Sequence, residues 1–335
     1  MTLRSPAGSS DAPGNVSGDT RDRRDVVTDH GSRRVVVVAL AANVAIAAAK
    51  FVAAAVTGSS ALLAEAFHSL ADSGNEILLG VAEARGGRPA DERHPFGYGR
   101  EAYFWALLAA VAVFVGGALL SVRQGIDELL RPTRVSSFVA GYVVLAVAFT
   151  LDGLSFRQAY RHLRAEAREV GRDVGTHFVL TSDPVTRAVL LEDVGAVAGS
   201  TVALVGLALR QFTGSHVPDA LAAVVVGAIL GLVAIQLAGR NRDFLVGEQA
   251  PEPFKASVRE AISAQQGIVA INELLATFVG PRRVWVVCRV DVDDALHGDD
   301  VERLVRDAER ATIEMSPIVV RADIVTVGRV PTADS

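Results

Sequence analysis

The sequence predicts an α-helical membrane protein, with six transmembrane helices followed by a small cytoplasmic α+β domain. Half of the 335 residues are apolar but only 6% are aromatic, and the mean hydropathy is +0.33. The apolar residues gather in long blocks of Ala, Val, Leu and Gly, which is typical of membrane spans rather than of one globular core. After about residue 240 these blocks give way to alternating helix-like and strand-like pieces.

Six stretches are long enough to cross a bilayer, which takes about 20 predominantly apolar residues in a helix. They are 35–56, 59–82, 102–122, 136–157, 186–209 and 217–239, so we expect a transmembrane domain at 35–240. The alternative is a large soluble protein with very hydrophobic core helices. The run "RRVVVVALAANVAIAAAKFVAAAV" argues against it, because this run has no polar face.

The first 34 residues are rich in Gly, Ser, Asp and Arg and contain no apolar core. This composition is typical neither of a signal peptide nor of a packed element. We expect 1–34 to be a disordered cytoplasmic tail.

The placement of arginine predicts the orientation of the spans. Arginines precede the first span and gather between spans two and three and between spans four and five. The connections on the other side carry few, although the one between spans three and four holds three. Because basic residues favour the cytoplasmic side, we expect both termini in the cytoplasm. We expect the membrane to be a bacterial cell membrane.

The fifth span has a clear start signal in "TSDPVTR". Ser182 or Asp183 stands where a helix N-cap belongs, and Pro184 falls in the first turn. Glu192 and Asp193 therefore lie about two to three turns inside this helix.

After the sixth span, the polar and proline-bearing segment 241–253 is typical of a linker. The pattern beyond it predicts a domain at 254–330 with the order α-β-β-α-β. Its elements are a helix at 254–264, strands near 269–278 and 284–292, a helix at 298–314 and a strand near 318–327. The only cysteine, Cys288, excludes an intramolecular disulfide and a multi-thiolate metal site.

Span two carries a polar stripe, "EAFHSLADSGNE", within an apolar run. His68 and Asp72 are four residues apart and project from nearly the same side of a helix. Glu76 continues the row, and Glu65 and Asn75 flank it. A carboxylate in hydrocarbon costs several kcal/mol unless it is paired, hydrated or coordinated. The stripe must therefore face the protein interior or a water-filled path.

Three interpretations of the stripe remain open: hydrogen bonds to neighbouring helices, a proton relay without metal, and a divalent-metal site. Five polar residues on one edge favour the metal site, because imidazole and carboxylate suit an ion such as Zn²⁺. Span five can add Glu192 and Asp193 at a depth like that of Asp72, and span four can add Asp152.

We predict that His68, Asp72 and Asp193 are the metal ligands, and Glu192 is the next candidate. The polar residues around them are predicted to support the ligands or to handle protons. They are Glu65, Asn75, Glu76 and Asp152.

Three segments of the sequence resemble those of a known family. The segments "GSSALLAEAFHSLADSGNEILLG", "DERHPFGYGREAYFWALLAA" and "TSDPVTRAVLLEDVGAVAGSTVALVGLAL" are similar to those of the cation diffusion facilitators, and the resemblance extends over all six spans and the C-terminal domain. It implies a homodimeric exporter, not an enzyme, that moves Zn²⁺ or a related divalent ion out of the cytoplasm against an inward flow of protons. It also implies an ion held between spans two and five, ferredoxin-like C-terminal domains that pair in the cytoplasm, and no prosthetic group or nucleic-acid partner.

The sequence also departs from the family pattern. Zinc-transporting members commonly have a second His-x-x-x-Asp pair in span five, but the residue four before Asp193 is Val189. Glu192 could take this role, although adjacent helical residues point about 100° apart. A site richer in oxygen favours harder ions, so export of Mn²⁺ or Fe²⁺ is the alternative.

The family resemblance also suggests an accessory ion site in the loop after span two, with Asp91 and His94 as its candidates. Tyr98 stands where some members have a second His, and the alternative is that "HPFGYG" only shapes a tight loop. The C-terminal domain holds a single histidine, His297. This favours dimerisation over metal sensing as its role.

A metal displaces protons from its ligands, so the favoured function is a proton-coupled antiporter. Gly116 and Gly117, with small residues throughout, would allow the close packing that sliding helices need.

Three other functions are alternatives to the antiporter. A passive divalent-cation channel would have the same polar stripe in span two. An intramembrane metalloenzyme is disfavoured because the chain has no His-Glu-x-x-His motif. The retained stripe also disfavours an interaction module with a degenerate membrane part.

Overall fold

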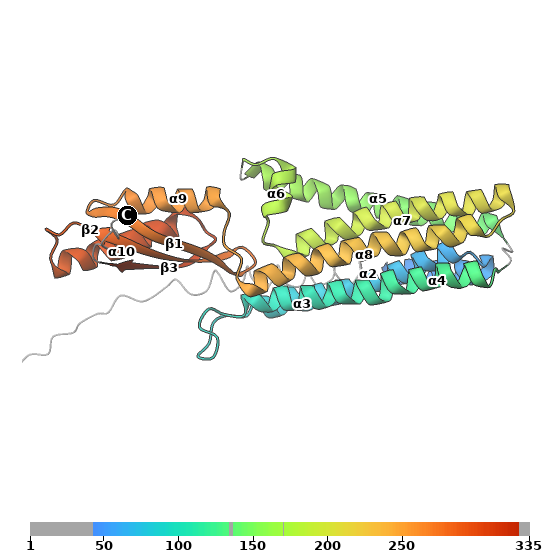
Figure 1. The fold of residues 1–335 in the computed structure, drawn as a ribbon, viewed down its shortest axis with the longest axis horizontal. Helices are drawn as coiled ribbons and strands as arrows, with labels where there is room; N and C mark the ends of the chain where they lie inside the picture. Colours follow the sequence, from blue (N-terminus) through green and yellow to red (C-terminus); the bar gives the residue numbers. More distant parts are fainter. Residues whose placement is uncertain (1–42, 134–136, 170, 328–335) are drawn as a thin grey trace, which may run out of the picture.

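The computed structural model describes residues 43–133, 137–169 and 171–327. A bundle of long helices forms one end of the molecule, and a small α/β domain forms the other (Figure 1). The predicted tail at 1–34 and the start of the first predicted span lie outside the described residues.

The bundle contains a helix for each predicted span. In chain order these are Asn43–Thr57, α2 (Ser60–Gly86), α3 (Gly99–Ala112) with its continuation, α5 (Phe138–Glu169), α7 (Pro184–Thr213) and α8 (Val217–Val246). The continuation of α3 is a π-helical segment, η1 (Val113–Leu119), followed by α4 (Leu120–Leu130). The π-helical turn contains the Gly116–Gly117 pair and lets the chain continue as one span of 32 residues.

Four of these helices are long and apolar enough to cross a membrane: Gly99–Leu130, Phe138–Glu169, Pro184–Thr213 and Val217–Val246. The described part of the first helix is short, and charged side chains recur along α2. The count of six spans therefore stays a prediction, whereas the helical membrane fold with a C-terminal α+β domain is confirmed.

The start of α7 follows the predicted capping signal. The Asp183 side chain accepts a hydrogen bond from the Val185 backbone at 2.9 Å, and Pro184 opens the helix. A short helix that the sequence analysis did not predict, α6 (Val174–Leu180), precedes it. Seven residues are too few for a helical period to stand out, and α6 depends on its Asp173 cap.

Most helices extend past the predicted span ends, α5 furthest, and α8 is the one that reaches toward the C-terminal domain. It continues to Val246 and so enters the segment assigned to the linker. Tertiary packing explains this, because Phe244 is buried and stacks on Tyr103 at 4.9 Å. The connection between the two parts therefore consists of the few residues between α8 and the next helix.

The C-terminal domain has the predicted order α-β-β-α-β. Its elements are α9 (Glu252–Ser263), β1 (Ile268–Gly280), β2 (Arg283–Val292), α10 (Gly298–Met315) and β3 (Val319–Thr326). β2 is the central strand, antiparallel to β1 and parallel to β3. Apolar side chains of α9, α10 and the sheet, such as Val258, Ala308 and Val286, form one buried core with Phe244 of the bundle.

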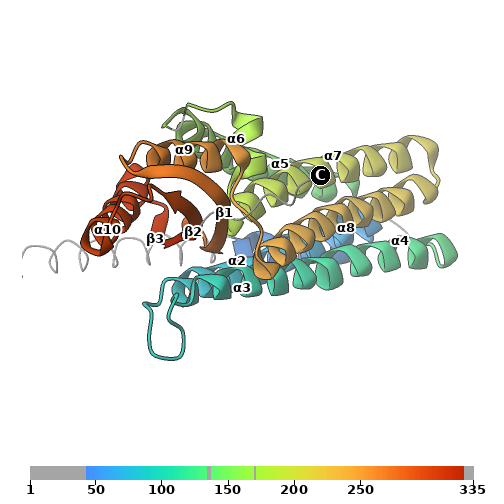
Figure 2. The ribbon, with the colours of Figure 1, turned by 60° about the vertical axis from the view of Figure 1, so that its left-hand side comes forward.

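The bundle and the C-terminal domain meet at two glycines. A Cβ atom at Gly280, in the β1–β2 hairpin, would lie 2.7 Å from the Cα atom of Gly99 at the start of α3, so neither position tolerates a side chain without movement. The 87–98 connection and the end of α5 lie at this same end of the bundle (Figure 2). These are the arginine-rich segments, so the positive-inside rule predicts that this end faces the cytoplasm.

Candidate metal-transport site

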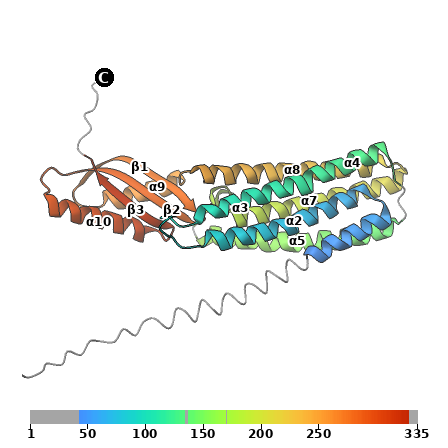
Figure 3. The same cartoon turned by 90° about the horizontal axis from the view of Figure 1, so that it is seen from below.

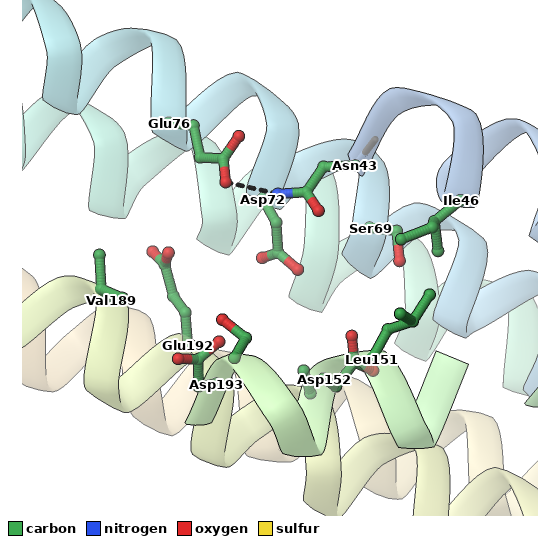
Figure 4. Close-up of a pocket in the computed structure, with 12 residues that line it drawn as sticks. Asn43, Ile46, Ser69, Asp72, Glu76, Leu151, Asp152, Val189, Glu192 and Asp193 are labelled. Atoms are coloured by element: carbon green, nitrogen blue, oxygen red, sulfur yellow. Dashed lines mark hydrogen bonds between the residues drawn. The ribbon is translucent and has the colours of Figure 1, made fainter. Parts of the chain in front are cut away.

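A cavity of about 120 Å³ lies inside the bundle (Figure 4). Residues of the first helix, α2, α5 and α7 line it. Figure 3 shows the first helix, in blue, beside α2. The polar residues that line the cavity are Asn43, Ser69, Asp72, Glu76, Asp152, Ser155, Glu192 and Asp193. An acidic cavity at the meeting point of apolar helices is where a transported cation would be shielded from lipid.

The α2 wall of the cavity is formed by the polar stripe. Asp72 and Glu76 lie one turn apart and both line the cavity, and Glu76 accepts a hydrogen bond from Asn43. His68 is fully buried and is not among the lining residues. Its Nδ1 atom lies 3.3 Å from the Asp72 Oδ1 atom, without hydrogen-bond geometry. The stripe therefore turns into the protein and not toward lipid.

The α7 wall presents both of its adjacent acids. Glu192 is 9% exposed and accepts a hydrogen bond of 2.6 Å from the Asn75 side chain of α2. Asp193 is half-buried and lies on the α5 side of the cavity (Figure 4). Glu192 and Asp193 project about 100° apart around α7, so their carboxylates reach different parts of the same cavity. Val189 lines the same wall one turn before Asp193.

Several buried oxygens of the cavity have no hydrogen-bond partner in the described part of the chain. They are Asp72 Oδ1, Glu192 Oε1 and Asp193 Oδ2. A buried carboxylate oxygen without a partner is costly, and a bound cation would satisfy it. The described residues include no group of three His, Cys, Asp or Glu side chains close enough to hold a metal ion together. A complete coordination shell would require these side chains to rotate into the cavity.

Glu65 and Asp152 occupy the far end of the polar region, with a partner that the sequence analysis missed. The Lys50 Nζ atom of the first helix lies 3.1 Å from Glu65 Oε2 and 4.0 Å from Asp152 Oδ2. The Ser200 hydroxyl of α7 lies within hydrogen-bond distance of an oxygen of each carboxylate, at 3.1 Å from Glu65 and 3.2 Å from Asp152, and can donate its proton to either. The sequence does contain a signal for this buried partner, because Lys50 is a lone lysine inside the apolar run "AAAKFVAAAV".

A second buried charge network closes the end of the bundle away from the C-terminal domain. Arg210 of α7 donates hydrogen bonds of 2.9 Å to Glu128 of α4 and to Asp219 of α8. Asp219 also accepts hydrogen bonds from the side chains of Ser59 and Ser60. These bonds connect four helices and the turn before α2. No local sequence pattern predicts this network, because it joins residues of different helices.

The loop candidates Asp91 and His94 lie together on the surface. Their side chains are 3.3 Å apart, and Asp91 also accepts hydrogen bonds from the Tyr98 hydroxyl at 2.6 Å and the His94 backbone at 2.7 Å. The Tyr98 hydrogen bond lowers the pKa of the Asp91 carboxyl. The loop is further fixed by Phe96, whose ring lies 4.5 Å from that of Trp285. These contacts favour the shaping of a tight loop, and the accessory ion site stays a prediction.

His297 and Cys288, the histidine and the cysteine of the C-terminal domain, stand in different structural elements. His297 stands at the N-cap position of α10, while Cys288 is buried in β2. Burial raises the pKa of the Cys288 thiol to about 11, so it stays protonated near neutral pH.

Fold and site together define the class: an integral membrane protein with an acid-lined cavity suited to cations. A family model described as "cation efflux transmembrane domain" matches residues 36–246. The chain therefore belongs to the cation efflux family, a family of transporters and not of enzymes, in agreement with the resemblance to cation diffusion facilitators.

Similar proteins carry names consistent with this family. The chain is 32% identical over 273 residues to the human "Proton-coupled zinc antiporter SLC30A9, mitochondrial". This alignment covers 82% of this chain and 48% of the human protein. It is 29% identical to "Metal tolerance protein C4" of Arabidopsis thaliana, over 77% of this chain and 57% of that one. It is 25% identical to "Cation-efflux pump FieF" of Escherichia fergusonii, over 78% and 81%. The chain thus spans about half the length of the first two relatives.

A solved structure titled "MamM-CTD 215-293" also matches. It covers 23% of this chain and 98% of its own, with 17% identity and a TM-score of 0.22.

Proposed function

We propose that this protein is a proton-coupled antiporter that exports divalent cations, Zn²⁺ first among them, from the cytoplasm. The observation that carries the proposal is the set of buried carboxylate oxygens from α2 and α7 that face one cavity without a hydrogen-bond partner in the described residues. Removing such oxygens from water is unfavourable unless a cation or a proton neutralises them. A site that exchanges one for the other is what an antiporter needs.

The proposed ligands are Asp72 and Asp193, joined by Glu192 and by His68 after side-chain rotation. His68 is placed to support Asp72, because its Nδ1 atom is 3.3 Å from the Asp72 carboxylate. One imidazole with several carboxylates suits Zn²⁺. The name of the 32% identical human relative also supports zinc and proton coupling. Mn²⁺ or Fe²⁺ is the alternative cargo, because oxygen ligands outnumber nitrogen ligands.

Coupling to protons follows from the chemistry of the ligands. Only neutral imidazole and ionised carboxylate coordinate a metal, so loading the ion from the cytoplasm requires these groups to lose their protons. When the site opens to the other side, protons compete for the same atoms and help to expel the ion. Asn75 holds one Glu192 oxygen at 2.6 Å, which leaves the other Glu192 oxygen, Oε1, for this exchange.

Three further features are part of the proposal, of which the family resemblance implies the first two. We propose that the protein works as a homodimer, that its C-terminal domains pair, and that both termini are cytoplasmic in a bacterial cell membrane. The proposed domain division is 1–34, 35–240, 241–253 and 254–330, with the last turns of α8, up to Val246, falling in the stretch 241–253.

Transport into proteoliposomes tests the function. Purified protein is reconstituted, Zn²⁺ is added outside, and its entry is followed with an internal fluorescent indicator under an imposed pH gradient. A lumen more acidic than the outside should drive accumulation by the wild type, and a protonophore should abolish it. Equal rates with and without the gradient would instead identify a passive channel.

Two variants and a matched control assign the site. Asp72→Asn and Asp193→Asn should each abolish accumulation while leaving expression and elution from a sizing column unchanged. Glu83→Gln, an exposed acid on the same helix as Asp72, should transport like the wild type. Wild-type transport by both cavity variants would remove the site assignment.

A further inference from the structure

Lys50 is the least expected side chain of the bundle. It lies on the first helix, is 1% exposed, and places its Nζ atom 3.1 Å from Glu65 Oε2, whose side chain is fully buried. A second carboxylate, Asp152 of α5, lies 4.0 Å from the same nitrogen. An ammonium group buried this deeply is rare and requires paired anions.

The packing around Glu65 is specific for this arrangement. On α7, a Cβ atom at Gly199 would lie 2.3 Å from Glu65 Oε1, so a larger residue there would displace the carboxylate from its present position. The neighbouring Ser200 hydroxyl lies 3.1 Å from Glu65 and 3.2 Å from Asp152, and it bridges the two acids. Four helices therefore meet at one lysine and two carboxylates.

This cluster is continuous with the transport cavity. Asp152 lines the cavity, together with Asp72, Glu192 and Asp193. A divalent cation in the cavity would thus meet Asp152, and behind it Glu65, as further oxygen ligands. Lys50 already contacts these two carboxylates from the other side, closely at Glu65 and at 4.0 Å at Asp152, and its charge offsets one of their two negative charges. A lysine ammonium is a compact charge on a flexible stem and competes with a metal ion for the same oxygens.

Resting on the proposed transport function, we propose that Lys50 is a tethered cation that occupies Glu65 and Asp152 and thereby confines the transported ion to the Asp72, Glu192 and Asp193 part of the cavity. Lys50 is a positioning residue in this account, since it acts on the ion through the carboxylates it withholds. It also limits the number of oxygen ligands, which bears on the choice between Zn²⁺ and harder ions.

A purely structural role would be served by any pair of groups that join the first helix to α2. The two roles differ in their effect on metal binding. Loss of the lysine charge should free two carboxylates for a cation, whereas loss of a mere packing contact should leave the metal-binding properties unchanged.

The test is equilibrium binding of Zn²⁺ alone to the purified full-length protein, with bound metal counted per chain, followed by competition with Mn²⁺. Lys50→Met should bind one additional ion per chain, or bind Zn²⁺ on the order of tenfold or more tightly, because a unit positive charge has left a low-dielectric site. It should also gain affinity for Mn²⁺. Lys50→Arg, which keeps the charge, should bind like the wild type.

Further variants keep the proposal testable if Lys50→Met does not fold. Glu65→Gln leaves the lysine without its nearest anion, so Zn²⁺ affinity should fall on the order of tenfold. Ser200→Ala removes hydrogen bonds from the same cluster without changing its charge, and should leave affinity unchanged. In the double variant Lys50→Met with Glu65→Gln, the number of bound ions should return to that of the wild type.

Two results would overturn the inference: a folded Lys50→Met protein with wild-type stoichiometry and affinity, or a Glu65→Gln protein with unchanged affinity. Failure of the wild type itself to bind Zn²⁺ or any other divalent ion would instead count against the proposed function.

Discussion

The missing histidine of span five gives a gain-of-function prediction. Val189 lines the cavity one helical turn before Asp193, in the spacing that His68 and Asp72 have on α2. In that α2 pair the imidazole nitrogen reaches to 3.3 Å from the carboxylate. Val189→His should place a second imidazole at the cavity, opposite the α2 stripe.

The size of the effect follows from the ligand chemistry. The cavity of about 120 Å³ has room for the ring, and Val189 is 37% exposed, so the substitution overpacks no core. An imidazole nitrogen in place of water or a distant oxygen should strengthen Zn²⁺ binding by about 1.4–2.8 kcal/mol, which is tenfold to a hundredfold. Mn²⁺ should gain less, because it prefers oxygen ligands.

The assay is competition between Zn²⁺ and Mn²⁺ for the purified protein, followed by transport of each ion into proteoliposomes. Val189→Gln supplies a polar side chain of similar length without an imidazole and serves as the control. A Zn²⁺-over-Mn²⁺ preference unchanged in Val189→His, or raised equally in Val189→Gln, would refute the assignment of α7 as the second wall of the metal site.

Three other predictions concern stability and reactivity. Arg210→Met leaves Glu128 and Asp219 buried without their cation, so the unfolding free energy in detergent should fall by about 3–5 kcal/mol; a denaturant titration measures this, and a loss under about 1 kcal/mol would contradict it. Cys288 is fully buried with a thiol pKa of about 11, so maleimide at pH 7 should label the folded protein far more slowly than the unfolded protein. The Tyr98 hydrogen bond lowers the Asp91 pKa below 3.8, so the ordering of the 91–98 loop should be fully present above that pH and be lost only as the pH falls through the lowered value. Hydrogen exchange of this loop in wild type and Asp91→Asn checks the last prediction, which fails if the two exchange alike at pH 7.

Local patterns in the sequence were enough to predict much of the fold. The cap formed by Asp183 and Pro184 marked the start of α7, and alternation of helix-like and strand-like pieces predicted the order of the C-terminal domain. Both signals depend on residues close together in the chain. The end of α8 could not be predicted in this way, because it is set by the packing of Phe244 on Tyr103, which lies far away in the sequence.

In the candidate site too, local sequence patterns predicted some features, whereas others depend on contacts between helices. Spacing within α2 identified Asp72 and Glu76 as one face, and the apolar surroundings of Glu192 and Asp193 made them conspicuous in α7. The hydrogen bond from Asn75 to Glu192 and the pairing of Lys50 with Glu65 depend on how the helices pack, which no local period encodes. The position of His68 behind Asp72, and not on the cavity wall, likewise depends on side-chain conformation. Binding of a cation by these residues stays a prediction.

The location of the bound ion tests the central claim most directly. Crystals of the full-length protein grown with Zn²⁺ would be measured at the zinc absorption edge, and the anomalous difference map would place the metal without reference to side chains. We predict the principal peak in the cavity, about 2.0–2.2 Å from carboxylate oxygens of Asp72 and Asp193. A cavity without a peak, with zinc bound only at the 91–98 loop or in the C-terminal domain, would contradict it.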